Sequence, residues 1–212
     1  MYKFFIGLVF VTLLFGCTST PNIKSDYNLD SNSSKGIMLA SISYVGGYSG
    51  YAVSLSDSSK TENWTIQFGE GMALIPIPPK GDYSSYGKKG ELFAIELPSG
   101  EYQIDEWNVF SGYATISPVT PISIEFKIEP GKATYIGNFN FTQTDSLGLT
   151  VTGVEVTYSD NFEEDSVVLG MKFPNINTNN ILMGISPNTS LRGFGGGGNA
   201  SWETPVVVLP QT

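Results

Sequence analysis

GIMLASISYVGGYSGYAVSL (Gly36–Leu55) is the stretch that decides the fold class. It contains two runs, Gly36–Tyr44 and Tyr48–Leu55, in which apolar residues alternate with small polar ones, and Gly46 and Gly47 separate them. Alternation with a period of two, together with β-branched and aromatic residues, is typical of β-strands. Two adjacent glycines can adopt the positive φ angles that tight turns require, so the stretch predicts a β-hairpin.

Similar strand-like runs follow along the chain and are separated by residues typical of turns. One exception is the segment Ala73–Gly90, which contains three prolines and is predicted to be a long loop, because proline has no N–H for a strand ladder. The further predicted strands are Asn63–Phe68, Glu91–Pro98, Glu101–Phe110, Pro121–Ile128, Ala133–Thr142 and Leu147–Tyr158. This series predicts an all-β fold, an antiparallel β-sandwich of the Ig-like or transthyretin-like kind.

One short helix is predicted near residues 160–173. Asp160 precedes Glu163 by three residues, which is the spacing of a capping box, and Pro174 follows the apolar positions. The acidic run Glu163–Asp165 suits the positive end of a helix dipole. Its spacing lacks the alternate ligands of a calcium loop, so no metal site is predicted.

The N-terminus has the pattern of an export signal. Lys3 precedes the apolar run Phe4–Phe15, which is too short to span a bilayer. The sequence around the only cysteine, LFGC, resembles the lipobox of bacterial lipoproteins. That resemblance implies cleavage between Gly16 and Cys17, diacylglyceryl transfer to Cys17 and acylation of the new amino terminus. The alternatives are an ordinary signal peptide with an incidental cysteine, and an uncleaved anchor.

The lipoprotein interpretation divides the chain into four parts. Residues 1–16 are the signal, residues 17–35 a lipidated flexible tether, residues 36–190 the sandwich and residues 191–212 a glycine-rich tail. The membrane is then contacted through the lipid on Cys17, in the bacterial cell envelope. Thr18 is not the aspartate that retains lipoproteins in the inner membrane of enteric-type bacteria, so the outer membrane is the expected location.

Composition excludes several classes of function. The formal net charge is −9, and it becomes −10 when Lys3 is removed with the signal, so nucleic acid is not an expected partner. The chain has no histidine and one cysteine. Catalytic triads that need histidine, histidine metal sites and an intramolecular disulfide are therefore excluded. We expect no cofactor and no enzymatic activity.

Two motifs resemble a known group of proteins. LPSGEYQI (Leu97–Ile104) and FKIEPGKATYIGNF (Phe126–Phe139) each combine a tight turn with a strand. Together they resemble uncharacterised bacterial envelope lipoproteins with a transthyretin-like or carboxypeptidase-regulatory-like β-sandwich. The resemblance implies a fold and surface attachment, and it carries no catalytic residue. Gly137 within the second motif would leave room for a neighbouring strand or ring.

Two sets of residues are candidates for a binding surface. An aromatic platform of Tyr44, Tyr48, Tyr51 and Trp107 could stack on sugar rings or on a protein, although core filling is the commoner role of such residues. The apolar residues of the long loop are either folded over one end of the sandwich or offered to a partner; the candidates there are Ile75 and Ile77.

Three functions follow from these features. The favoured one is a lipid-anchored, non-catalytic envelope protein that presents the sandwich to a protein partner. The alternative is a carbohydrate-binding envelope module that uses the aromatic platform on a cell-wall glycan. The least favoured is a hydrolase that uses two facing carboxylates. Its candidate acids are Glu96, Glu101, Asp105 and Glu106.

Overall fold

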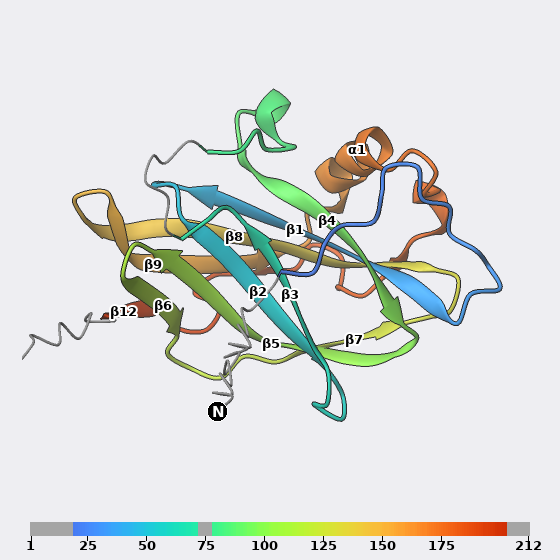
Figure 1. The fold of residues 1–212 in the computed structure, drawn as a ribbon, viewed down its shortest axis with the longest axis horizontal. Coiled ribbons are helices and arrows are strands. Elements are labelled where there is room, and N and C mark those ends of the chain that lie inside the picture. The colour runs from blue at the N-terminus through green and yellow to red at the C-terminus, as the bar shows by residue number, and fades with distance from the viewer. Residues whose placement is uncertain (1–18, 72–77, 203–212) are drawn as a thin grey trace, which may run out of the picture.

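A computed structural model describes residues 19–71 and 78–202 (Figure 1). Gly16, Cys17, Ile75 and Ile77 therefore lie outside the described residues. The described chain is all-β, with two layers of strands and one α-helix, as predicted. No helix within it is long and apolar enough to cross a membrane.

The first layer holds four strands and the second layer five. The first layer contains β4 (Lys89–Pro98), β1 (Lys35–Val45), β8 (Ala133–Leu147) and β9 (Thr150–Ser159). The second contains β3 (Asn63–Phe68), β2 (Gly50–Asp57), β5 (Gly100–Ser111), β6 (Ala114–Pro118) and β7 (Ile124–Ile128). The remaining elements are α1 (Phe162–Lys172), β10 (Leu182–Met183), β11 (Ser190–Leu191), β12 (Gly198–Trp202) and the 3-10 turns η1 (Ser84–Tyr86) and η2 (Thr178–Asn180).

The two layers form one continuous hydrogen-bonded sheet that folds over on itself. β12 pairs with β6 of the second layer and with β9 of the first, so it joins them. The prediction was an antiparallel sandwich. One pair of long strands differs from it, because β1 runs parallel to β8. Two residues of β8, Ile136 and Gly137, lie opposite the single residue Ala40 of β1, and Gly137 has a φ of 117°. This bulge places Tyr135 and Asn138 on the same outer face of the layer.

The predicted hairpin at Gly46 and Gly47 is wrong. β1 pairs with β4 and β8, whereas β2 pairs with β3 and β5. The two glycines therefore carry the chain from one layer to the other. The local pattern indicated both strands correctly, but the two strands face one another across the core. Tyr44 of β1 stacks on Tyr51 of β2 with ring centroids 4.7 Å apart.

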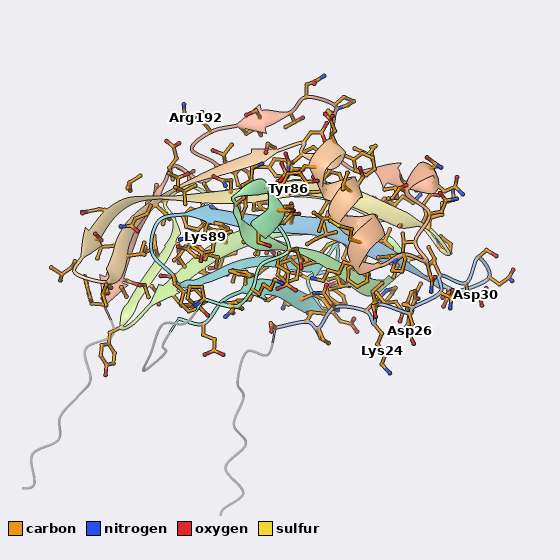
Figure 2. The ribbon with its side chains drawn as sticks, turned by 90° about the horizontal axis from the view of Figure 1, so that it is seen from above. Lys24, Asp26, Asp30, Tyr86, Lys89 and Arg192 are labelled. Atoms are coloured by element: carbon orange, nitrogen blue, oxygen red, sulfur yellow. The ribbon has the colours of Figure 1, made fainter. Side chains whose placement is uncertain are left out.

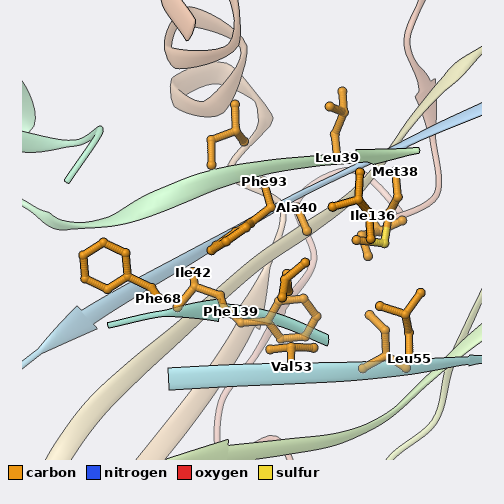
Figure 3. Packing of buried hydrophobic residues seen from close by; sticks show 14 of the residues in the cluster. Met38, Leu39, Ala40, Ile42, Val53, Leu55, Phe68, Phe93, Ile136 and Phe139 are labelled. Atoms are coloured by element: carbon orange, nitrogen blue, oxygen red, sulfur yellow. The ribbon is translucent and has the colours of Figure 1, made fainter. Parts of the chain in front are cut away.

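Large side chains from both layers fill the core. Figure 3 shows Ile42 and Phe139 of the first layer facing Val53 of the second. Phe141 of β8 packs against Trp107 of β5, with ring centroids 5.9 Å apart. At about 25 cal/mol per Å² of buried apolar surface, these contacts supply the main stabilisation of a chain without a disulfide.

The N-terminal arm (residues 19–34) is docked on the sandwich, which corrects the prediction of a flexible tether. The Thr20 N–H donates to the Thr65 carbonyl of β3 at 2.7 Å, and the Ile23 N–H donates to the Ala94 carbonyl of β4 at 2.9 Å. The arm thus bridges the two open edges of the folded sheet. The Tyr27 hydroxyl donates to Glu96 at 2.6 Å. Other arm residues, Lys24, Asp26 and Asp30, point outward (Figure 2).

The glycine-rich segment after residue 191 also belongs to the sandwich, in contrast to the predicted tail. The carbonyl of Phe194 accepts the indole N–H of Trp107 at 3.0 Å. Gly195 and Gly198 pass so close that an added Cβ would lie 2.7 Å and 2.9 Å from the Trp107 ring. Glycine is needed here because the backbone itself covers the tryptophan. The sandwich therefore extends to Trp202 rather than to residue 190.

Helix α1 is confirmed within the predicted range. Asn161 is the N-cap residue, and the Asp160 carboxylate just before it accepts the Phe162 N–H at 3.1 Å. Leu169 and Phe173 are buried on one face, against the outer face of the first layer. The third residue of the acidic run, Asp165, is buried as well.

Candidate functional site

The predicted aromatic platform is wrong. Tyr44, Tyr51 and Trp107 are at most 3 % exposed, because the alternation of β1, β2 and β5 turns them into the core. Tyr48 is half-buried, and its hydroxyl accepts the Glu70 N–H at 3.0 Å. These four side chains cannot present a flat stacking surface to a glycan.

The candidate acids do not face one another across a cleft. Glu96 is held by Lys35 and Tyr27, and Glu101 is exposed on β5. A register shift in β5 puts Asp105 and Glu106 on the same outer face, where both line an open depression of about 620 Å³. Two neighbours on one strand lack the opposed geometry that glycoside hydrolysis requires.

A buried carboxylate is the most unusual polar feature of the molecule. Asp165 of α1 is 1 % exposed, and its oxygens accept four hydrogen bonds. The donors are Tyr83 at 2.5 Å, Ser41 at 2.6 Å, Tyr135 at 2.7 Å and Asn161 at 3.3 Å. These donors come from the loop before η1, from β1, from β8 and from the N-cap of α1. Asp165 therefore fastens the helix to the first layer.

The environment of Asp165 shifts the pKa of its carboxyl upward. Burial raises the pKa of the Asp165 carboxyl above its ordinary value, and the four hydrogen bonds oppose that shift only in part. Burial also raises the pKa of Tyr83 and of Tyr135, with the Asp165 charge adding to the effect. Asp165 is closed off from solvent, and its hydrogen bonds are all to groups of the protein itself.

A row of polar side chains, the polar ladder (Ser41, Ser43, Asn138 and Asn140), leads to this carboxylate across the parallel pair β1–β8. The Asn140 amide donates to the Ser43 hydroxyl at 2.8 Å, which donates to the Asn138 amide oxygen at 3.2 Å. The Asn138 amide donates to Ser41 at 2.7 Å, and Ser41 donates to Asp165. Every hydroxyl and amide in the row is thereby oriented.

The polar ladder forms the floor of a pocket of about 260 Å³, the ladder pocket. It lies beside α1 on the outer face of the first layer, and Figure 2 shows η1, marked by Tyr86, over the same face. Each lining residue carries a polar group, and the lining comes from five elements or their flanks. Besides the ladder residues Ser43, Asn138 and Asn140, the lining residues are Tyr83, Lys88, Thr157, Ser159, Asn161 and Glu164.

One end of the sandwich, the apolar end, exposes large apolar side chains. They are between 50 % and 87 % exposed and come from four elements or turns: Val45, Tyr113, Leu147, Leu149 and Trp202. The turns lie close together, since a Cβ at Gly112 would be 3.7 Å from the Thr150 hydroxyl. Trp202 pairs with Ala114, next to Tyr113. The β8–β9 turn and β12 both lie on the left side of Figure 1.

Neither the comparisons with known proteins nor the arrangement of possible metal ligands assigns a function to this chain. The chain matches no protein-family model, no curated protein and no solved structure. Among residues 19–71 and 78–202, no group of three or more acidic, cysteine or histidine side chains is arranged to hold a metal ion.

The sequence contained a signal for the polar ladder that the prediction missed. Ser41 and Ser43 alternate with apolar residues on β1, and Asn138 and Asn140 alternate with Phe139 and Phe141 on β8. An asparagine on alternate positions of a strand is unusual, because asparagine is depleted in strands. Two such strands paired together indicate a buried polar face.

Proposed function

We propose that this chain is a lipid-anchored, non-catalytic protein of the bacterial envelope that docks another envelope protein on its apolar end. The observation that carries the proposal is the exposed apolar end itself, where Leu149 is 87 % exposed and Leu147 68 % exposed at the tip of one hairpin. Contiguous apolar patches on soluble domains mark sites of association. Tyr113 and Trp202 are of the residue types that anchor protein interfaces.

The docked arm supports the anchoring part of the proposal. Cys17 precedes Thr20 by three residues, and Thr20 is hydrogen-bonded to β3. Three residues span at most about 10 Å, so a lipid on Cys17 would hold the sandwich close to the headgroups. Its apolar end would then be presented at a restricted height above the membrane. We propose the outer membrane as the location.

Charge favours a protein partner over the lipid surface at the apolar end. The chain is acidic, with 20 carboxylate residues against 11 basic ones. Anionic headgroups repel such a chain and attract basic segments. We therefore assign the apolar end to a protein and the lipid contact to Cys17 alone.

Lipidation is tested by metabolic labelling with a clickable fatty acid. We expect label on the wild type and on the Thr18→Ala control, and none on Cys17→Ala. Equal labelling of Cys17→Ala would refute the anchor.

Docking is tested by a photo-crosslinking amino acid at Leu149 in intact cells. We expect one discrete protein adduct that is lost when Leu147→Asp is added. The control position is Met171, which is 63 % exposed and belongs to α1, a helix on the other side of the molecule from the β8–β9 turn and β12 (Figure 1). Adducts with phospholipid alone, or the same adducts from position 171, would refute a protein partner at the apolar end. Because this readout does not measure fatty acid, failure of docking is distinct from failure of lipidation.

A further inference from the structure

We propose that the ladder pocket binds a small neutral polyhydroxylated molecule, the size of one sugar ring. The inference does not depend on lipidation or on the apolar end. The ladder pocket has a volume of about 260 Å³, which corresponds to roughly nine water molecules at about 30 Å³ each. This is space for a single ring with its hydroxyl groups.

The lining matches hydroxyl groups in number and in kind. Thr157 and Ser159 of β9 bring hydroxyls that can both donate and accept, and the Asn140 and Asn161 amides add donors and acceptors. Glu164 Oε1 is buried without a hydrogen-bond partner among the described residues, although such atoms normally have one. A hydroxyl donor in the pocket would satisfy it.

Charge in the pocket selects a neutral ligand. Lys88 and Glu164 form an ion pair at 2.5 Å, so each neutralises the other. Asp165 lies behind Tyr83 and Asn161, both of which donate to it, and it does not line the pocket. An anion such as phosphate would meet Glu164, and an amino acid would have to break the Lys88–Glu164 pair.

The floor of the pocket is held in place before a ligand binds. Ser43 and Asn138 are 7 % and 5 % exposed, and their side chains bond to each other and to the next residues of the polar ladder. Parallel pairing of β1 with β8 sets their spacing. Groups that are already oriented lose little conformational entropy on binding, which is the condition for recognition by hydrogen bonds alone.

Burial of the predicted aromatic platform does not exclude a sugar from the ladder pocket. Stacking on an exposed ring is not part of this site, and the contacts are polar. We therefore expect weak binding, with a dissociation constant on the order of 1 mM.

The test is saturation-transfer NMR and calorimetry on the full chain purified in mild detergent. The probes are glucose, galactose, mannose and N-acetylglucosamine, with alanine and inorganic phosphate as non-matching ligands. We expect saturable binding of at least one sugar and none of alanine or phosphate. The double variant Thr157→Val, Ser159→Ala keeps the side-chain shapes and should bind at least tenfold more weakly. Thr115→Val on β6 is the matched control and should bind normally.

A second measurement keeps the test decisive if the double variant does not fold. On titration of the wild type with sugar, the side-chain amide signals of Asn138, Asn140 and Asn161 should show the largest chemical-shift changes. No saturation by any sugar overturns the proposal. Binding of alanine or phosphate instead overturns the ligand class, and amide shifts located elsewhere overturn the site.

Discussion

Replacing Asp165 by alanine should be among the most destabilising substitutions in this protein. The carboxylate accepts four hydrogen bonds from buried or half-buried donors on four separate segments. Each donor left without an acceptor costs about 1–3 kcal/mol. Asn161 is half-buried and can donate to water instead, so we expect a loss of about 3–5 kcal/mol in the free energy of unfolding.

The loss is measured by urea unfolding and by calorimetry. For a domain of this size about 1 kcal/mol lowers Tm by roughly 2–4 °C, so Asp165→Ala should lower Tm by about 10 °C. Asp165→Asn keeps the shape and one acceptor oxygen, and should lose about half as much. A loss below about 1 kcal/mol for Asp165→Ala would refute the view that this residue fastens α1 to the first layer.

The same residue predicts the sign of a pH dependence. In the unfolded chain the Asp165 carboxyl titrates near about 3.9, and burial raises its pKa in the folded protein. Above about pH 4 the folded protein keeps a proton that the unfolded chain has lost. The free energy of unfolding therefore falls as the pH rises from that point to the folded pKa. Relative to Asp165→Asn, the wild type should lose stability over this range, and a gain would contradict the raised pKa.

Three further predictions concern the fold and the arm. Gly137→Ala should destabilise the protein by about 2–4 kcal/mol in urea unfolding, because φ is 117° and the new Cβ would lie 2.7 Å from the Tyr158 ring; an unchanged midpoint would refute the bulge. Tyr27→Phe should increase amide hydrogen exchange at Ile23, since the hydroxyl bond to Glu96 holds the arm; unaltered exchange would contradict docking. Lys35 and Tyr27 lower the pKa of Glu96, so its carboxylate stabilises the folded protein above about pH 4.5 and this stabilisation is lost as the pH falls. Glu96→Gln should therefore lower the free energy of unfolding at neutral pH and much less at acidic pH. An equal lowering at acidic pH would contradict this.

Local pattern was enough to find most strands and the helix. β3 coincides with the predicted range, and α1 lies inside the range predicted from Asp160 and Pro174. These elements depend on a side-chain period and on caps within a few residues, which a sequence displays directly. The short strands β6, β10, β11 and β12 were missed, because two to five residues contain too little periodicity to recognise.

Which strands pair with one another, and which of their side chains are buried, could not be predicted in the same way. Nothing local distinguishes a β1–β2 hairpin from a crossing between layers, and the choice decided that Tyr44 and Tyr51 are core residues. The arm is polar and resembles a linker, yet its backbone satisfies two open strand edges. Exposure of any side chain therefore depended on contacts that are remote in the chain.

The sequence alone determined the positions of most strands, the acidic charge, the absence of histidine and the solitary Cys17 within a lipobox-like pattern. Tertiary structure decided the parallel pairing of β1 with β8, the burial of Asp165 and the two surfaces on which function is proposed. Ser43 and Asn138 are separated by 95 residues, and Ser41 and Asp165 by 124. Propensity acts over a few residues, whereas a polar ladder and an apolar end exist only after distant segments have paired and packed.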